Sequence, residues 1–124
     1  MKTILFFCGL YAAAFAIFHL LFWKIFRWKT ALQPLDVVNR GILQILNCRM
    51  VYFFMLVAFI CFAYPAELLS SRLGHVLLGG ISLFWLGRTI EQFIFLRVRD
   101  PRVHLLTVIF ILGTILFALP IFFK

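Results

Sequence analysis

Apolar residues follow one another in long runs along this chain, without the strict alternation of a half-buried strand or the narrow stripe of a soluble helix. Four runs are long enough to cross the hydrocarbon core of a bilayer, which needs about 20 helical residues for roughly 30 Å. They cover residues 3–23, 41–63, 74–96 and 104–123. The pattern predicts an all-α fold, an antiparallel up-and-down bundle of four transmembrane helices that forms a single domain over residues 1–124.

The segment between the first two runs, residues 24–40, is polar and basic. Trp23 and Trp28 flank its first part, and amphipathic aromatic side chains of this kind gather at the head-group level of a membrane. Pro34 is a helix-start signal further along the segment. We therefore expect an interfacial basic connector between the first and second helices.

The start of the second helix is ambiguous in the sequence. Residues 41–63 have the right length but include Gln44, Asn47 and Arg49, whereas residues 50–69 are more apolar but include Pro65. Because polar residues at helical spacing can occupy one face of an emerging helix, we favour a single long helix with amphipathic first turns. We expect this helix to end near Pro65.

Composition excludes an ordinary soluble domain. Hydrophobic residues make up 65% of the chain and charged residues 13%, whereas soluble domains have about 45–50% and about 25%. The formal charge of +8 is typical of nucleic-acid binding in a soluble protein, but here the basic residues lie between apolar runs. This placement favours anionic lipid head groups as partners and argues against nucleic acid.

The distribution of basic residues also predicts an orientation. The first and third connections carry more of them than the rest of the chain outside the apolar runs, and cytoplasmic loops are enriched in Lys and Arg. These connections contain Lys24, Arg27, Lys29, Arg40, Arg97, Arg99 and Arg102, against Lys2, Arg72 and Lys124 on the other side. We therefore expect a multi-pass protein of the inner or plasma membrane with both termini outside.

Ionisable and amide side chains interrupt the third run at Arg88, Glu91 and Gln92. Their i, i+3 and i+4 spacing puts them on one face of a helix. A charged residue inside a membrane costs about 2.5–3.5 kcal/mol on insertion scales and usually faces the protein interior or a wet cavity. Two interpretations stay open: Arg88 and Glu91 form an internal pair that locks helix packing, or they belong to a functional site.

Small and polar residues in the other runs suggest inward-facing stripes at steps of three and four. The stripes are Gly9, Ala12, Ala16, His19 and Trp23; Gly80, Phe84, Gly87 and Glu91; and His104, Thr107, Ile111, Thr114 and Ala118. Helical rise places His19, Glu91 and His104 within roughly 10 Å of the cytoplasmic boundary. The sequence thus predicts a shared polar pocket whose candidate residues are Arg88, Glu91, Gln92, His19, Asn47, Arg49 and His104.

The leading functional hypothesis is a non-enzymatic membrane protein that binds or moves a small anionic or amphipathic ligand, with proton coupling as a variant. Arg88 would hold the anion, because guanidinium binds phosphate and carboxylate through a two-pronged fork. Glu91 would orient Arg88 or exchange a proton, and His19, Asn47 and Gln92 would supply hydrogen bonds. Because Asn47 and Arg49 are separated by about 200° around a helix, they cannot both point inward.

Two alternatives come from other functional classes. The protein could be a structural or accessory subunit, acting as a homo-oligomer or within a larger membrane complex. Less favoured is a haem or metal site in which His19 and His104, with or without Glu91, supply the ligands. No HExxH motif, histidine cluster or metal-ligand cysteine spacing supports it, so we expect no cofactor and no enzymatic activity.

Overall fold

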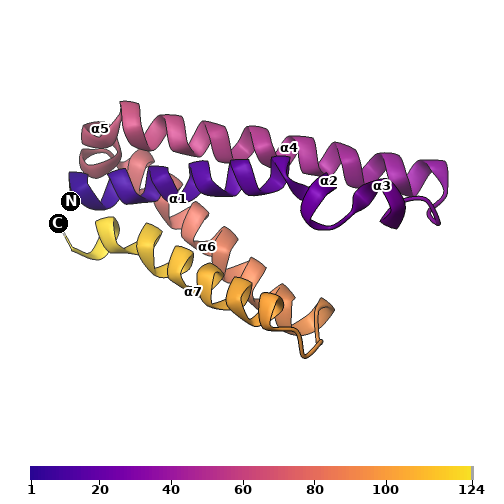
Figure 1. Cartoon of the computed structure of the whole chain (residues 1–124). Coiled ribbons are helices and arrows are strands. Elements are labelled where there is room, and N and C mark those ends of the chain that lie inside the picture. Colours follow the sequence, from indigo (N-terminus) through magenta and orange to yellow (C-terminus); the bar gives the residue numbers. More distant parts are fainter. Residues whose placement is uncertain (124) are drawn as a thin grey trace. The chain divides into compact units, whose positions relative to one another are not determined.

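The computed structural model describes residues 1–123, which form helices and connecting turns with no strand among them (Figure 1). The helices are α1 Lys2–Leu20, α2 Phe22–Ile25, α3 Trp28–Ala31, α4 Val37–Ala63, α5 Pro65–Ser70, α6 Arg72–Phe95 and α7 Pro101–Phe122. Four of them, α1, α4, α6 and α7, are long and apolar enough to cross a membrane. The predicted fold class, an all-α bundle of four transmembrane helices, is confirmed, and the chain is a multi-pass membrane protein.

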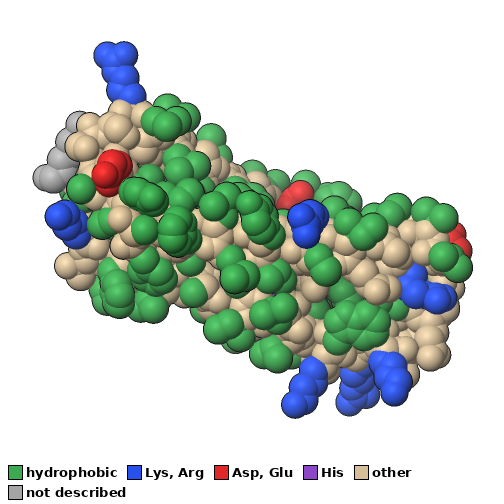
Figure 2. All heavy atoms as spheres, turned by 90° about the horizontal axis from the view of Figure 1, so that it is seen from above, with side chains coloured by type: hydrophobic (Ala, Val, Ile, Leu, Met, Phe, Trp, Pro, Cys, Tyr) green, Lys and Arg blue, Asp and Glu red, His purple; other side chains and the backbone are tan. Residues whose placement is uncertain are grey.

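Large apolar side chains cover much of the outer surface of the long helices (Figure 2). Leu73 and Phe95 of α6, for example, are 77% and 76% exposed, and Phe122 of α7 is 77% exposed. A soluble protein rarely exposes apolar surface on this scale, because each Å² left in water costs about 25 cal/mol. These exposed apolar faces are therefore suited to contact with lipid tails.

The chain divides into two compact units, and Gly9–Ile60 forms one of them. It contains the second part of α1, the short helices α2 and α3, and most of α4. Phe54 of α4 packs against two residues of α1, with ring centroids 5.7 Å from Phe15 and 5.0 Å from His19. Ala12 and Ala16 are buried, as the predicted small-residue stripe of α1 requires.

The end of α1 is set by a side chain from α4. Nδ2 of Asn47 donates to the backbone carbonyl of His19 at 3.0 Å. After this point the backbone N–H groups of Lys24 and Ile25 donate to the carbonyl of Leu21. The last carbonyls of a helix have no partner within it and must be satisfied elsewhere. Asn47 supplies that partner, and α1 therefore ends at Leu20, three residues before the predicted end.

The connector between α1 and α4 is held to α4 by one arginine. The guanidinium of Arg40 donates to the carbonyl oxygens of Leu32, Gln33 and Leu35 at 3.1, 3.1 and 2.8 Å. Arg27 allows the change of direction between α2 and α3 by adopting left-handed backbone angles, with φ at 52°. The basic connector is thus tied by hydrogen bonds to the first turn of α4.

The second helix itself follows the prediction. It runs as one uninterrupted helix of 27 residues, Val37–Ala63, and Pro65 opens the next helix. Asp36 precedes it and accepts the backbone N–H of Asn39 at 2.7 Å, which satisfies one of the free donors of its first turn.

The other unit joins Met1–Cys8 to residues 61–123, and its corner between α5 and α6 is closed by Ser71. The Ser71 hydroxyl donates to the carbonyl oxygen of Glu67 at 2.7 Å and accepts the backbone N–H of Gly74 at 2.9 Å. Gly74 is buried so close to Leu68 that a Cβ atom there would overlap the Leu68 backbone. The close approach of two backbones therefore requires glycine at this position.

Helices α6 and α7 form an antiparallel hairpin with a mainly aromatic contact. Trp85 stacks on Phe110 with centroids 5.6 Å apart and an interplanar angle of 22°, and the Ser82 hydroxyl donates to the carbonyl of Thr114 at 2.7 Å. The buried face of α6 comprises Gly74, Leu78, Ile81, Ser82, Trp85, Thr89 and Gln92. The packed face of α6 therefore combines large apolar side chains with polar ones, and it excludes Gly80.

The predicted stripe of α6 was wrong, and that of α7 holds only in part, since Thr107 does contact Gln92 of α6. Gly80 and Glu91 are exposed, and a Cβ atom at Gly80 or Gly87 would meet nothing within 4 Å. On α7 the buried residues are Phe110, Gly113, Phe117 and Pro120, whereas Ile111 of the predicted stripe is exposed. The packed faces are rotated from the small-residue faces because the Trp85–Phe110 contact buries more apolar area than glycine can.

Candidate functional site

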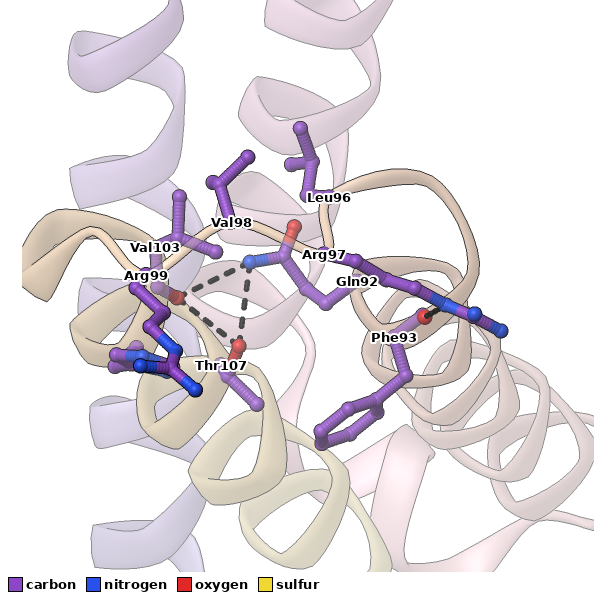
Figure 3. Close-up of a pocket in the computed structure, with 9 residues that line it drawn as sticks. Gln92, Phe93, Leu96, Arg97, Val98, Arg99, Val103 and Thr107 are labelled. Atoms are coloured by element: carbon purple, nitrogen blue, oxygen red, sulfur yellow. Dashed lines mark hydrogen bonds between the residues drawn. The ribbon is translucent and has the colours of Figure 1, made fainter.

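A cavity of about 240 Å³ lies at the turn that joins α6 to α7 (Figure 3). One part of its wall is apolar and the other is basic or able to form hydrogen bonds. The lining residues are Gln92, Phe93, Leu96, Arg97, Val98, Arg99, Val103, His104 and Thr107. Two of the predicted site residues, Gln92 and His104, are thus brought together in one pocket.

Gln92 is the deepest polar side chain of this pocket, with an exposed fraction of 2%. Its Nε2 donates to the Val103 carbonyl and to the Thr107 hydroxyl oxygen, both at 3.2 Å, and that hydroxyl donates to the same carbonyl at 3.0 Å. Figure 3 shows this triangle of hydrogen bonds across the hairpin. Because both partners of Gln92 act as acceptors, the network fixes which end of the carboxamide faces α7.

The other end of the carboxamide is unsatisfied. Oε1 of Gln92 is buried and has no hydrogen-bond partner among the described residues. It points away from Val103 and Thr107 (Figure 3). A buried acceptor without a donor costs about 1–3 kcal/mol, so most such groups in folded proteins have a partner. Gln92 lines the pocket, so its carboxamide leaves a buried acceptor without a donor at the pocket wall.

The outer part of the pocket is cationic. Arg97 and Arg99 are both exposed, and Nε of Arg97 donates to the Phe93 carbonyl at 2.8 Å near the end of α6. Arg102 does not line the pocket; it forms an ion pair with Asp100 at 3.3 Å. None of the lining residues is acidic, so an anion meets no like charge in the pocket wall.

Asp100 and Pro101 start α7 beside the pocket. The Asp100 carboxylate accepts the backbone N–H of Arg102 at 2.9 Å, and Pro101 occupies the first helical position, where its missing N–H is not needed. The backbone N–H and the side chain of Arg102 hold the pKa of the Asp100 carboxyl below its ordinary value of 3.8. This cap fixes where the helix, and with it His104 and Thr107, begins.

Asp100 should make the hairpin sensitive to acid. Because its pKa is lower in the folded protein, its contribution to stability is complete above the ordinary value of 3.8 and is lost as the pH falls through the folded value. We expect the Asp100→Asn variant to lose less stability than wild type between neutral and strongly acidic pH. Thermal unfolding in detergent, followed by circular dichroism for both proteins across that range, tests it; identical acid sensitivity would contradict the role of this cap.

Arg88 and Glu91, the centre of the predicted site, do not line the pocket. The Arg88 guanidinium lies 4.7 Å from the centroid of the Phe110 ring, a cation–π contact, and Arg88 is half-buried. Glu91 is exposed, and no ion pair joins it to Arg88 in the described part of the chain. The structure therefore has Arg88 supporting the α6–α7 contact through an aromatic ring.

The remaining predicted site residues lie in the Gly9–Ile60 unit. Nδ1 of His19 donates to the Phe15 carbonyl at 2.9 Å, and its ring stacks on Phe22 at 4.4 Å. Asn47 binds the His19 carbonyl, as described above. Arg49 is exposed with its guanidinium 5.8 Å from the Tyr52 ring centroid, so Asn47 and Arg49 do point to different sides, as their spacing predicted.

Sequence reasoning treated Arg97 and Arg99 only as orientation signals and Thr107 only as a stripe residue. The signal that could have joined them is the spacing of Val103 and Thr107, one helical turn apart and directly after the basic turn. Among the described residues no group of three His, Cys, Asp or Glu side chains lies close enough to hold a metal ion. The haem or metal alternative and the predicted oligomer or larger complex stay predictions.

Comparison with known proteins does not extend this assignment: no family model, curated protein or solved structure matches the chain. The function must therefore be argued from the pocket itself.

Proposed function

We propose that this multi-pass membrane protein binds an anionic amphipathic ligand, with its phosphate-bearing head group in the α6–α7 pocket. The observation that carries the proposal is the pocket wall: two arginines, a histidine and two hydrogen-bonding side chains stand beside apolar residues, with no acidic residue among them. Guanidinium groups bind phosphate strongly, and the apolar side suits the adjoining glycerol and acyl carbons of a lipid.

The backbone around the pocket supports an anion as well. Val103 and His104 lie in the first turn of α7, and the N-terminal end of a helix carries a partial positive charge. The end of α6 carries the opposite partial charge, but the Arg97 guanidinium already binds the Phe93 carbonyl there. Because the Asp100 carboxylate already caps the start of α7, attraction of an anion into the pocket would come mainly from the Arg97 and Arg99 guanidinium groups.

The proposed orientation suits this ligand. With both termini outside, the turn between α6 and α7 reaches the cytoplasmic leaflet, where anionic lipids concentrate and each nearby basic residue contributes about 1 kcal/mol of attraction. The interfacial connector, with Lys24, Arg27 and Lys29, would face the same leaflet. In this proposal Arg88 and Glu91 have no direct contact with the head group.

Native mass spectrometry of the full chain in mild detergent tests the proposal. Wild-type protein should retain an anionic phospholipid in preference to phosphatidylcholine. Replacing Arg97 and Arg99 together by Gln should weaken that binding roughly thirtyfold, because two contributions of about 1 kcal/mol each are removed.

Arg72→Gln is the matched control, since it removes one exposed arginine at the opposite end of α6 and leaves the pocket intact. We expect its lipid binding to stay close to that of wild type. The proposal fails if phosphatidylcholine is retained as well as the anionic lipid, or if the pocket variant and the Arg72 variant bind alike.

A further inference from the structure

We propose that the head group in this pocket carries a hydroxyl beside its phosphate, and that this hydroxyl donates a hydrogen bond to Oε1 of Gln92. The inference rests on the proposed function and names the class of ligand: a hydroxylated phosphate ester, such as the glycerol head group of an anionic phospholipid. Arg97 and Arg99 select for the negative charge, and Gln92 selects for the donor.

The need for a donor follows from the hydrogen-bond network around Gln92. Its Nε2 is occupied by the Val103 carbonyl and the Thr107 oxygen, so turning the carboxamide over would place Oε1 against the Val103 carbonyl and lose the hydrogen bond to it. Oε1 stays fixed, buried and without a partner in the described part of the chain. A ligand that brings a donor removes this penalty, and one without a donor leaves it in place.

The positions of the polar groups set the order of the ligand's parts. Gln92 is almost fully buried, whereas Arg97 and Arg99 are exposed at the outer side of the same cavity. The Arg97 and Arg99 side chains leave the turn in different directions (Figure 3), so a phosphate held by either of them would have the next part of its head group directed toward Gln92. A cavity of about 240 Å³ is smaller than a pocket for a drug-sized molecule and suits a small polyol.

The charge of the pocket favours a hydroxyl over an ammonium group as the donor. An ammonium group would enter a pocket that has two arginines and no acidic lining residue, so it would be repelled. A zwitterionic head group would also bring no net charge for the arginines to attract. A neutral hydroxyl satisfies Oε1 without either cost.

Two lipids of the same charge, one with hydroxyls in its head group and one without, provide the test. Phosphatidylglycerol and phosphatidylethanol with the same acyl chains carry the same single negative charge, but the ethyl head group has no hydroxyl. In titrations of the full chain by native mass spectrometry, wild type should bind phosphatidylglycerol about fivefold to tenfold more tightly. Gln92→Met, which keeps the side-chain length without the acceptor, should bind both lipids alike, whereas Gln44→Met, the same change outside the pocket, should keep the preference.

The outcomes separate the two proposals. If wild type binds both anionic lipids equally but better than phosphatidylcholine, the hydroxyl inference is overturned and the proposed function stands. If neither anionic lipid exceeds phosphatidylcholine, the proposed function itself fails. Displacement of bound phosphatidylglycerol by free glycerol phosphate would support the same chemistry from a soluble source, and resistance to displacement would support the lipid. Because the wild-type comparison needs no variant, a Gln92 variant that does not fold leaves the test intact.

Discussion

The substitution Gly74→Ala is expected to destabilise the protein by roughly 3 kcal/mol, which is the upper part of the range for overpacking a tight site. The added Cβ would overlap the backbone of Leu68, which is less able to move aside than the end of a flexible side chain. The corner is also held by Ser71, which binds Glu67 on one side and Gly74 on the other, so a shift of α6 would break these bonds. Equilibrium unfolding in detergent should show the loss.

Two other glycines of α6 provide matched controls for this substitution. A Cβ atom at Gly80 or Gly87 meets nothing within 4 Å, and alanine is the better helix former by about 1 kcal/mol. Gly80→Ala and Gly87→Ala should therefore leave stability unchanged or raise it slightly. Equal stability of all three variants would mean that α5 and α6 are not in backbone contact at Gly74.

Asn47→Asp is expected to cost about 2–4 kcal/mol by breaking the link between α1 and α4. The change keeps the size of the side chain but replaces the Nδ2 donor with an oxygen that faces the His19 carbonyl at the former hydrogen-bond distance of 3.0 Å. The lost hydrogen bond is worth about 1 kcal/mol, and an unsatisfied acceptor or charge in a buried place adds the rest. Chemical unfolding of the two proteins in the same detergent measures the difference.

The control for this variant is Gln44→Glu, the same exchange of amide for carboxyl one turn earlier on α4. Gln44 makes no hydrogen bond with its side chain in the described structure, so the change should stay within about 0.5 kcal/mol. If both variants lose the same stability, the cost belongs to any added acid on this helix, and Asn47 does not hold the end of α1.

The sequence predicts the four long helices well because lipid penalises unsatisfied polar backbone groups. A helix satisfies these groups within itself, so an apolar run of this length is expected to be helical. The start of α7 was predicted three residues late, at His104, because the basic run suggested a turn up to Arg102. In the structure Asp100 caps the helix and Pro101 is its first residue. The break after α1 was not readable, since Leu21 is no helix breaker and the cause, Asn47, is distant in the chain.

The site was predicted only in part, because the contacts within it depend on how α6 and α7 are rotated against each other. Gln92 and His104 were identified because polar residues near apolar runs stand out, and both line the pocket. The partner of Arg88 was not predictable from charge, because the Phe110 ring is an alternative to Glu91 that depends on how α6 and α7 are rotated. That rotation follows from the stacking of Trp85 on Phe110, which the spacing of small residues does not reveal.

The unequal lengths of α1 and α4 affect how the protein fits bilayers of different thickness. At 1.5 Å per residue the 19 residues of α1 span about 28 Å and the 27 residues of α4 about 40 Å, against a hydrocarbon core of about 30 Å. Hydrophobic mismatch must then be absorbed by tilting α4 or by letting its first turns project beyond the lipid tails. Because Arg40 ties the connector to those turns, the connector would follow the start of α4 in either response.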